Sequence, residues 1–371
     1  MNRRVLVARL DSLGDVLLCG PAVRAIAAAP DVDEVWMLCS SIGAEAARAL
    51  PAVDEVRVWD SPWITVTAPR ATRAHLAALD AIVAEAAPDA AVILTSFHQS
   101  PLPLALALRL AGVPLIAGAS VDHAGTLLDV RLRPGEDLVE DQPEPARALA
   151  IAAAAGFALP PGDDGRLRMR VDAPLPAELA ALGTYVVVHP GAAAPARRWP
   201  TTAHAEVVRM LHAAHAEVVR MLHAAGVAVV VTGGPEEREL TAHVSGAGRH
   251  GLDRGERTGL AELAATLAGA AVVVVGNTGP AHVAAAVGTP VVSLFSPVVP
   301  SVRWAPYGIE HVMLGDQEAP CRDSRARECP VPGHPCLASV APVDVVDAVF
   351  ALAPDLRGRA ATAPAREQVG A

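Results

Sequence analysis

The most regular feature of the chain is a series of short apolar runs, each of which ends in a polar loop that contains glycine. Four of these runs are Arg4–Leu10, Tyr185–Val188, Val227–Val231 and Ala271–Val275. Their length and Val-rich composition are typical of buried strands, and helical, Ala-rich segments lie between them. Strands that alternate with helices in this way predict an α/β fold with parallel sheets and right-handed crossovers.

The loops that follow these strands are the first candidates for a functional site, because ligands of parallel sheets bind beyond the carboxyl ends of the strands. The loop after the fourth run reads Gly276-Asn277-Thr278-Gly279-Pro280 and leads into a short helix. Thr278 is a natural helix cap and Pro280 suits the first turn. The unpaired N–H groups of such a turn attract anions, so the loop predicts a phosphate-binding site.

Length and composition indicate two domains. A chain of 371 residues is long enough for two cores, and its 3% of aromatic residues fits an Ala- and Val-rich α/β protein. The stretch Leu159–Pro176, rich in Pro, Gly and Asp, is the predicted linker. We therefore expect an N-terminal Rossmann-like domain over 1–165 and a C-terminal one over 166–354. The polar tail 355–371 is expected to be disordered.

The net charge and the lack of a targeting signal limit what the chain is expected to bind and where it is expected to be found. The chain has no lysine and a net charge of −10, which argues against a broad nucleic-acid surface but allows a local arginine patch. No apolar stretch is long and clean enough to span a membrane, and Arg9, Asp11 and Asp15 interrupt any signal sequence. We expect a cytoplasmic protein whose five cysteines are mostly thiols.

Four loop motifs together resemble one known family. They are Arg-Leu-Asp-Ser-Leu-Gly-Asp at 9–15, His-Pro-Gly with Arg-Arg-Trp-Pro at 189–200, Thr-Gly-Gly-Pro-Glu-Glu at 232–237, and Gly-Asn-Thr-Gly-Pro-Ala-His at 276–282. Their types and order are similar to those of glycosyltransferase family 9, the bacterial heptosyltransferase-like enzymes of lipopolysaccharide core assembly. The similarity extends over about residues 4–345.

The resemblance implies a GT-B architecture, in which two Rossmann-like domains face each other across a cleft. It implies an ADP-heptose or similar nucleotide-sugar donor in the C-terminal domain and a saccharide or lipid-linked acceptor in the N-terminal domain. It also implies inverting transfer without a catalytic metal or other cofactor, at the inner face of the membrane if the acceptor is lipid-linked.

On the acceptor side, the resemblance makes Asp15 the catalytic base. Inverting transfer needs a group that takes the proton of the attacking hydroxyl, and a carboxylate at a strand-to-helix turn suits that task. Asp15 could equally supply only negative charge to the first turn of its helix, and Asp11 is expected to be a cap or loop residue. Gly14, His98 and Gln99 are the acceptor-site candidates.

On the donor side, Arg197 occupies the place of a basic residue that the family uses on the donor phosphates, a task suited to a bidentate guanidinium. Arg198 could be an ordinary surface residue. Glu236 or Glu237 could bind ribose hydroxyls, or either could be a helix-start acid. Many relatives have Asp at position 277, which leaves a carboxylate role there in doubt. The complete donor set is Arg197, Thr232, Gly233, Glu236, Glu237, Asn277, Thr278, Gly279 and His282.

Two further features stand apart from these motifs. The sequence His-Ala-Glu-Val-Val-Arg-Met-Leu-His-Ala-Ala occurs twice in tandem, at 204–214 and 215–225. A helix could absorb the extra copy nearly in register, or the copy could loop out. The other feature is a segment with Cys321, Cys329, His334 and Cys336, which could form a zinc site or a reduced loop; the spacing lacks a Cys-x2-Cys pair and favours the loop.

Two other functions remain open from the sequence. A nucleotide-sugar 2-epimerase of GT-B fold would keep the nucleotide loops, but the Asp-Ser-Leu-Gly-Asp turn speaks against it. A non-catalytic nucleotide-sugar binding protein is the second alternative, if the repeat displaces the C-terminal domain.

Overall fold

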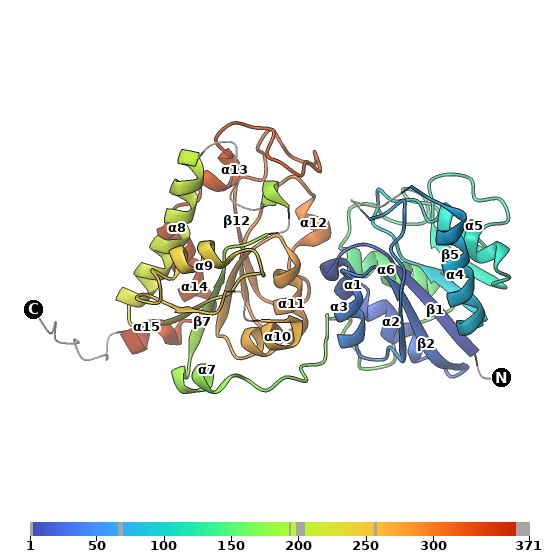
Figure 1. Ribbon diagram of the computed structural model, residues 1–371, viewed down its shortest axis with the longest axis horizontal. Helices are drawn as coiled ribbons and strands as arrows, with labels where there is room; N and C mark the ends of the chain where they lie inside the picture. Colours follow the sequence, from blue (N-terminus) through green and yellow to red (C-terminus); the bar gives the residue numbers. More distant parts are fainter. Residues whose placement is uncertain (1–2, 66–69, 193, 198–204, 256–257, 361–371) are drawn as a thin grey trace, which may run out of the picture. The chain divides into compact units, whose positions relative to one another are not determined.

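The computed structural model describes residues 3–65, 70–192, 194–197, 205–255 and 258–360. They divide into two compact units. The first unit runs to Val171 and includes the later segment Val302–Gly308; the second comprises Asp172–Ser301 and continues from Ile309. Each unit contains one six-stranded sheet with helices packed against it (Figure 1).

The sheet of the first unit has the order β3-β2-β1-β4-β5-β6, and all its paired strands are parallel. The chain moves outward from β1 to β3 and then returns to the other side of β1, a switch point typical of Rossmann-like folds. The strands are β1 Arg3–Arg9, β2 Val32–Cys39, β3 Glu55–Val58, β4 Ala90–Ile93, β5 Leu115–Ala119 and β6 Val130–Leu132. The helices are α1 Leu13–Leu18, α2 Gly20–Ala27, α3 Ala44–Ala49, α4 Arg73–Ala86, α5 Leu102–Leu110 and α6 Glu144–Ala154.

The second unit repeats this plan with the order β12-β11-β10-β7-β8-β9, again with parallel pairs. Its switch point lies between β7 and β10. The strands are β7 Tyr185–His189, β8 Ala228–Val231, β9 Leu252–Asp253, β10 Val272–Gly276, β11 Val291–Leu294 and β12 His311–Leu314. The helices are α7 Ala177–Leu182, α8 Ala205–Ala224, α9 Arg238–Val244, α10 Leu260–Ala268, α11 Gly279–Val287, α12 Ser301–Trp304, α13 Pro335–Ala338, α14 Pro342–Leu352 and α15 Asp355–Ala360, with a 3₁₀ turn at Pro195–Arg197. Helix α12 is divided between the units: Ser301 belongs to the second unit, and the rest of the helix belongs to the first.

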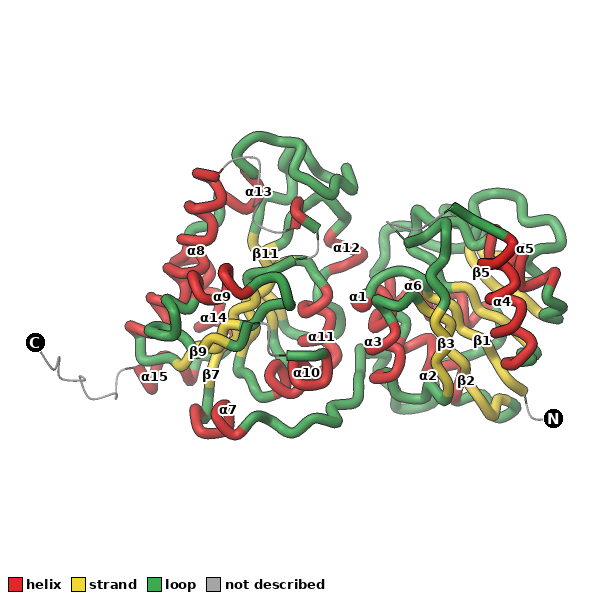
Figure 2. The backbone as a smooth tube through the Cα atoms, in the orientation of Figure 1, coloured by secondary structure: helices red, strands yellow, loops and turns green. Residues whose placement is uncertain are grey.

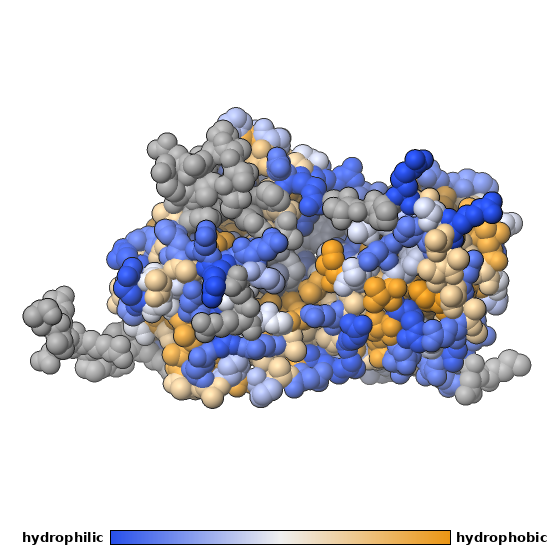
Figure 3. All heavy atoms as spheres, in the orientation of Figure 1, coloured by the Kyte–Doolittle hydropathy of each residue, from blue (hydrophilic) through white to orange (hydrophobic). Residues whose placement is uncertain are grey.

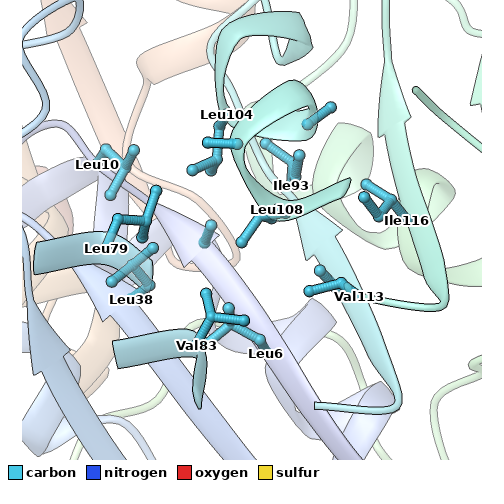
Figure 4. Packing of buried hydrophobic residues seen from close by; sticks show 14 of the residues in the cluster. Leu6, Leu10, Leu38, Leu79, Val83, Ile93, Leu104, Leu108, Val113 and Ile116 are labelled. Atoms are coloured by element: carbon cyan, nitrogen blue, oxygen red, sulfur yellow. The ribbon is translucent and has the colours of Figure 1, made fainter. Parts of the chain in front are cut away.

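A continuous apolar layer between the first sheet and the helices α4 and α5 holds the first unit together. Leu6 and Ile93 project from the central strands towards Leu79 and Leu108 of the two helices, and all four side chains are buried (Figure 4). Burial of each such side chain stabilises the fold by roughly 1.5–3 kcal/mol. The predicted parallel α/β architecture, with two Rossmann-like units, is confirmed.

The chain between α6 and α7 contains no helix or strand, as predicted for a linker (Figure 2). Its first part is nevertheless tied to the first unit. Arg24 of α2 forms a two-pronged ion pair with Asp163, at 2.7 and 2.9 Å, and the backbone N–H of Arg170 donates to Ala49. These contacts carry the first unit to Val171, beyond the expected boundary at 165.

The tandem repeat forms one continuous helix, α8, which spans Ala205–Ala224. The loop-out alternative is therefore not what the structure adopts. Val218, Val219 and Leu222 of the second copy are buried, while Arg220 lies on the exposed side and pairs with Glu217. The second copy thus supplies the apolar stripe that packs on the unit. The side chains of the first copy up to His212 lie outside the described residues.

The C-terminal end differs from the expectation of disorder over 355–371. Asp355–Ala360 forms helix α15, and residues 361–371 lie outside the described part of the chain. No helix within the described residues is long and apolar enough to cross a membrane. On the face shown in Figure 3, apolar residues form separate patches in a largely polar surface.

Candidate active site

The acceptor-side candidate Asp15 lies in the first turn of α1, just beyond the carboxyl end of β1. Its carboxylate is held on both oxygens. Oδ1 accepts hydrogen bonds from Arg9 Nη2 at 3.0 Å and from Trp304 Nε1 at 3.2 Å, while Oδ2 accepts one from Ser12 Oγ at 2.6 Å. Ser12 is exposed, so the Oδ2 side of the carboxylate is the one nearer to solvent.

Arg9, the last residue of β1, organises this end of the sheet. Its side chain is only 2% exposed and pairs with Asp11 at 2.5 Å, with Asp15, and with Glu144 of α6 at 3.6 Å. It also donates to Ser96 Oγ at 2.7 Å, and Ser96 donates to Asp11. Three carboxylates thus converge on one guanidinium at the switch point between β1 and β4.

Burial shapes the protonation of this cluster. It raises the pKa of Asp11 to about 6, although the Arg9 guanidinium opposes the rise. It also raises the pKa of Glu144, again against the effect of Arg9. Burial alone would lower the pKa of Arg9, but Asp11 and Asp15 raise it well above its ordinary value. Arg9 therefore stays charged, while burial favours the protonated forms of Asp11 and Glu144.

The other acceptor-site candidates lie close to this cluster. Gly14 is buried within α1. His98 and Gln99 follow β4, where Gln99 Oε1 accepts a hydrogen bond from the Ser96 backbone at 3.1 Å and the His98 ring packs edge-on against Phe97. Gln99 also lines a small pocket together with Trp63, Ile64 and Thr95. The structure therefore brings Asp15 and Gln99 to the same edge of the sheet, linked through Arg9 and Ser96.

The donor-side candidates gather at the carboxyl ends of three adjacent strands, β8, β7 and β10. His189 Nδ1 lies 3.0 Å from Thr232 Oγ1, which joins the first two loops. Burial lowers the pKa of His189, against the raising effect of Glu237. A neutral imidazole next to the Thr232 hydroxyl is the result.

The structure separates the two adjacent glutamates. Glu236 is exposed, whereas Glu237 is buried and accepts a hydrogen bond from the Gly234 backbone at 2.8 Å. A Cβ atom on Gly191 would lie 2.0 Å from Glu237 Oε2, so a larger residue there would displace the Glu237 carboxylate. Glu237 is thus the member of the pair that faces the β7 loop, where the donor motif His-Pro-Gly lies. Gly233 is also buried in this loop.

Asn277 ties two loops together. Its Nδ2 donates to the Ser296 carbonyl at 3.1 Å, and its Oδ1 accepts from the Ser296 N–H at 3.2 Å. An ionised carboxylate could not make this two-way pairing, because it cannot donate to the carbonyl. It fixes the loop after β10 against the end of β11.

The predicted phosphate loop continues into α11 as expected. Thr278 is the N-cap, but its side chain makes no capping hydrogen bond, and Gly279 begins the helix. His282 is buried in the first turns of α11. The carbonyl of Arg197 lies against Gly276, where a Cβ would be 3.2 Å away. Arg197 therefore belongs to the same loop cluster, whereas Arg198 lies outside the described residues.

The cysteine segment contacts the end of β11 through Cys336 and Ser296. Cys321, Cys336 and His334 are buried, and all five cysteines are free thiols. Cys336 Sγ lies 3.9 Å from Ser296 Oγ, and Cys329 Sγ lies 3.3 Å from the Val331 carbonyl. Among the residues described, no three His, Cys, Asp or Glu side chains are placed to hold a metal ion. The zinc alternative therefore has no support.

Sequence reasoning missed two residues of this site. Arg9 carries a local signal, since a charged residue ends an otherwise apolar strand directly before the Asp15 turn. Trp304 carries none, because 289 positions separate it from its partner.

Comparison with known proteins identifies the family. The model described as "Glycosyltransferase family 9 (heptosyltransferase)" matches residues 147–334. Lipopolysaccharide heptosyltransferase 3 of Escherichia coli is 31% identical over 205 residues, which cover 53% of this chain and 53% of that protein. The chain thus matches about half the length of this curated relative.

Solved structures agree at the level of fold. A family 9 glycosyltransferase from Veillonella parvula superposes with a TM-score of 0.71 at 17% identity, covering 95% of this chain and 97% of the other. E. coli ADP-heptose heptosyltransferase II gives 0.68 at 18%, covering 94% and 98%. E. coli heptosyltransferase WaaC with ADP gives 0.68 at 19%, covering 94% and 100%. Because the family model matches half of its length, the chain belongs to glycosyltransferase family 9.

Proposed function

We propose that this chain is an inverting, metal-independent glycosyltransferase that moves heptose or a related sugar from a nucleotide-sugar donor to a saccharide or lipid-linked acceptor. The observation that carries the proposal is the placement of Asp15. Its carboxylate stands beyond the end of a central strand, fixed by Arg9 and Trp304 on one oxygen and bonded by the exposed Ser12 hydroxyl on the other.

The proposed step is a single displacement. An acceptor hydroxyl takes the place of Ser12 at Asp15 Oδ2 and attacks the anomeric carbon of the donor sugar, while its proton passes to Asp15. The bond between that carbon and the diphosphate oxygen breaks, and the nucleoside diphosphate leaves with the electron pair. The configuration at the anomeric carbon inverts because attack and departure occur on opposite faces.

The second unit supplies the charge that the leaving diphosphate needs. The N–H groups of the first turn of α11 and the guanidinium of Arg197 are its proposed partners, and they make a metal ion unnecessary for leaving-group stabilisation. Thr232, Gly233 and Glu237 are the proposed contacts to the nucleoside, and Glu237 is preferred to the exposed Glu236.

An adenosine diphosphate sugar is the proposed donor class. Two similar structures are those of E. coli heptosyltransferase WaaC with ADP and with ADP-2-deoxy-2-fluoro heptose. The relation to a lipopolysaccharide heptosyltransferase supports an acceptor of saccharide or lipid-linked type, used at the cytoplasmic face of the membrane.

The test is transfer by the wild-type protein and by Asp15→Asn. Incubation with ADP-heptose, and separately with UDP-GlcNAc, distinguishes transfer or donor hydrolysis from epimerisation and from binding alone. Asn is isosteric but cannot take the proton, so we expect the rate to fall by roughly 10²–10⁴. Calorimetry should show donor affinity nearly unchanged, and activity should survive EDTA.

Asp122→Asn, a change of the same type on the β5–β6 connection, is the matched control and should keep full activity. Near-wild-type turnover by Asp15→Asn would show that Asp15 is not the catalytic base. Epimerised UDP-GlcNAc, or donor binding without turnover, would replace the proposal by one of the two alternative functions.

A further inference from the structure

The chain contributes a segment from its C-terminal half to the unit that carries Asp15. After β11 the backbone leaves the second unit at Ser301, and residues 302–308 pack within the first unit before the chain returns at Ile309. Trp304 of α12 lies in this segment and donates its indole N–H to Asp15 Oδ1 at 3.2 Å.

Buried charges fix the segment in place. Arg303 is 4% exposed; it pairs with Glu140 at 2.8 Å and with Glu144 at 3.6 Å. Its guanidinium carbon also lies 4.2 Å from the centre of the Phe97 ring, which packs 5.8 Å from the Trp304 ring. The indole is therefore held between an anchored neighbour and an aromatic ring, with little freedom to turn.

We propose that Trp304 is a positioning residue for Asp15, which fixes Oδ1 so that Oδ2 is the oxygen that receives the acceptor proton. This inference rests on the proposed transferase function. An indole N–H suits the task because it donates, cannot accept a proton and adds no charge. Arg9 supplies the second donor to the same oxygen, so the carboxylate cannot rotate without breaking two hydrogen bonds.

The indole bond also favours the ionised form of Asp15, because hydrogen bonds to a carboxylate lower its pKa. The titratable groups whose charges interact with Asp15 include Arg9 of β1, Asp11 of the following loop, Cys19 after α1 and Glu144 of α6. Burial raises the pKa of Cys19 to about 12, so Cys19 stays neutral in the working range. Burial raises the pKa of Asp11 to about 6, and Asp11 is retained in a Trp304 variant, so the comparison is made between the two pH profiles and not on one profile alone.

The experiment is Trp304→Phe, which keeps a ring against Phe97 and deletes the N–H. We expect kcat to fall roughly tenfold with the donor KM unchanged. The acidic limb of the pH profile of kcat should move to higher pH by roughly half a unit to one unit, because the base loses a bond to its ionised form. Trp36→Phe is the matched control, since its indole bonds to Glu34 at 2.9 Å, away from Asp15.

A second measurement does not depend on turnover. The indole N–H resonance of Trp304, assigned by its absence in Trp304→Phe, should shift in Asp15→Asn, and that of Trp36 should not. The proposal would be overturned if the acidic limb of the kcat profile stayed at the same pH in Trp304→Phe. It would also be overturned if the Trp304 resonance did not shift in Asp15→Asn. A wild-type protein without transferase activity would instead overturn the proposed function, and the resonance would still decide whether Trp304 holds Asp15.

Discussion

At the residue scale, Asn277 shows how a single side chain in a motif can serve the fold rather than the reaction. Relatives with Asp at this position could suggest a carboxylate role, but the amide here is used on both sides by the Ser296 backbone. Its side chain is buried, so a substituted group would have no water to replace these bonds. Asn277 therefore sets the shape of the proposed phosphate loop.

We expect Asn277→Asp to lower the free energy of unfolding by roughly 1–3 kcal/mol at pH 7, because a buried carboxylate would face the Ser296 carbonyl. Burial favours the protonated acid, which can still donate, so the folded-state pKa of the new carboxyl would be raised. The loss should therefore be small near pH 4 and grow as pH rises towards 7. Denaturant unfolding at several pH values measures it.

Gln142→Glu makes the same amide-to-acid change at a less buried site whose amide donates to the Val139 carbonyl. Its effect should be smaller and nearly independent of pH. This account would be contradicted if the two variants lost equal free energy of unfolding. It would also be contradicted if the loss in Asn277→Asp became smaller as pH rises.

At the element scale, α8 demonstrates that an eleven-residue insertion can be tolerated by a helix. Eleven residues advance about 1100°, some 20° beyond three turns, so both copies present their apolar stripe on nearly the same side. In the second copy, Val218, Val219 and Leu222 of this stripe are buried.

Deletion of His215–Ala225 should leave a folded protein with equal or higher stability. The two copies are identical, so removal of either gives the same sequence, and the remaining stripe can occupy the packed position. The helix should shorten by about 16 Å. Thermal unfolding, helical circular dichroism and nucleotide binding measure the outcome, and a deletion variant that fails to fold would show that both copies are integral.

At the scale of the whole molecule, the two units share a plan but are joined by more than one crossing of the chain. The extended connection between α6 and α7 is anchored through Arg24 and Asp163, and the segment Val302–Gly308 returns to the first unit. The hydrogen bonds from Arg24 hold the pKa of Asp163 well below its usual value. This pair stabilises the fold above the unfolded-state pKa of about 4, and its contribution is lost as pH falls through the folded-state value.

Arg24→Met should destabilise the first unit by about 3–5 kcal/mol, because it leaves the Asp163 carboxylate buried without its partner. Limited proteolysis should then cut between α6 and α7 faster than in the wild type. The double variant Arg24→Met/Asp163→Leu removes both charges and should recover much of the stability. If the double variant is no more stable than the single one, the ion pair is not the anchor.

Local patterns determined the fold class and the candidate loops. Short Val-rich runs that end in glycine loops specify parallel strands, and parallel strands place their following loops at one edge. For this reason Asp15 and the motifs at 189, 232 and 276 were found as strand-end loops from sequence alone. Helix α15 at Asp355–Ala360 was not predicted, because a short polar helix has no apolar pattern to reveal it.

Tertiary structure alone decided which side chains meet. It buried Glu237 and left Glu236 exposed, turned the Asn277 amide towards Ser296, and placed Arg9 among three carboxylates. It also brought Trp304 to Asp15 across 289 positions. The physical reason is that periodicity records only which face of an element is buried. The partner on that face depends on where the crossovers return the chain, and no local pattern in the sequence carries that information.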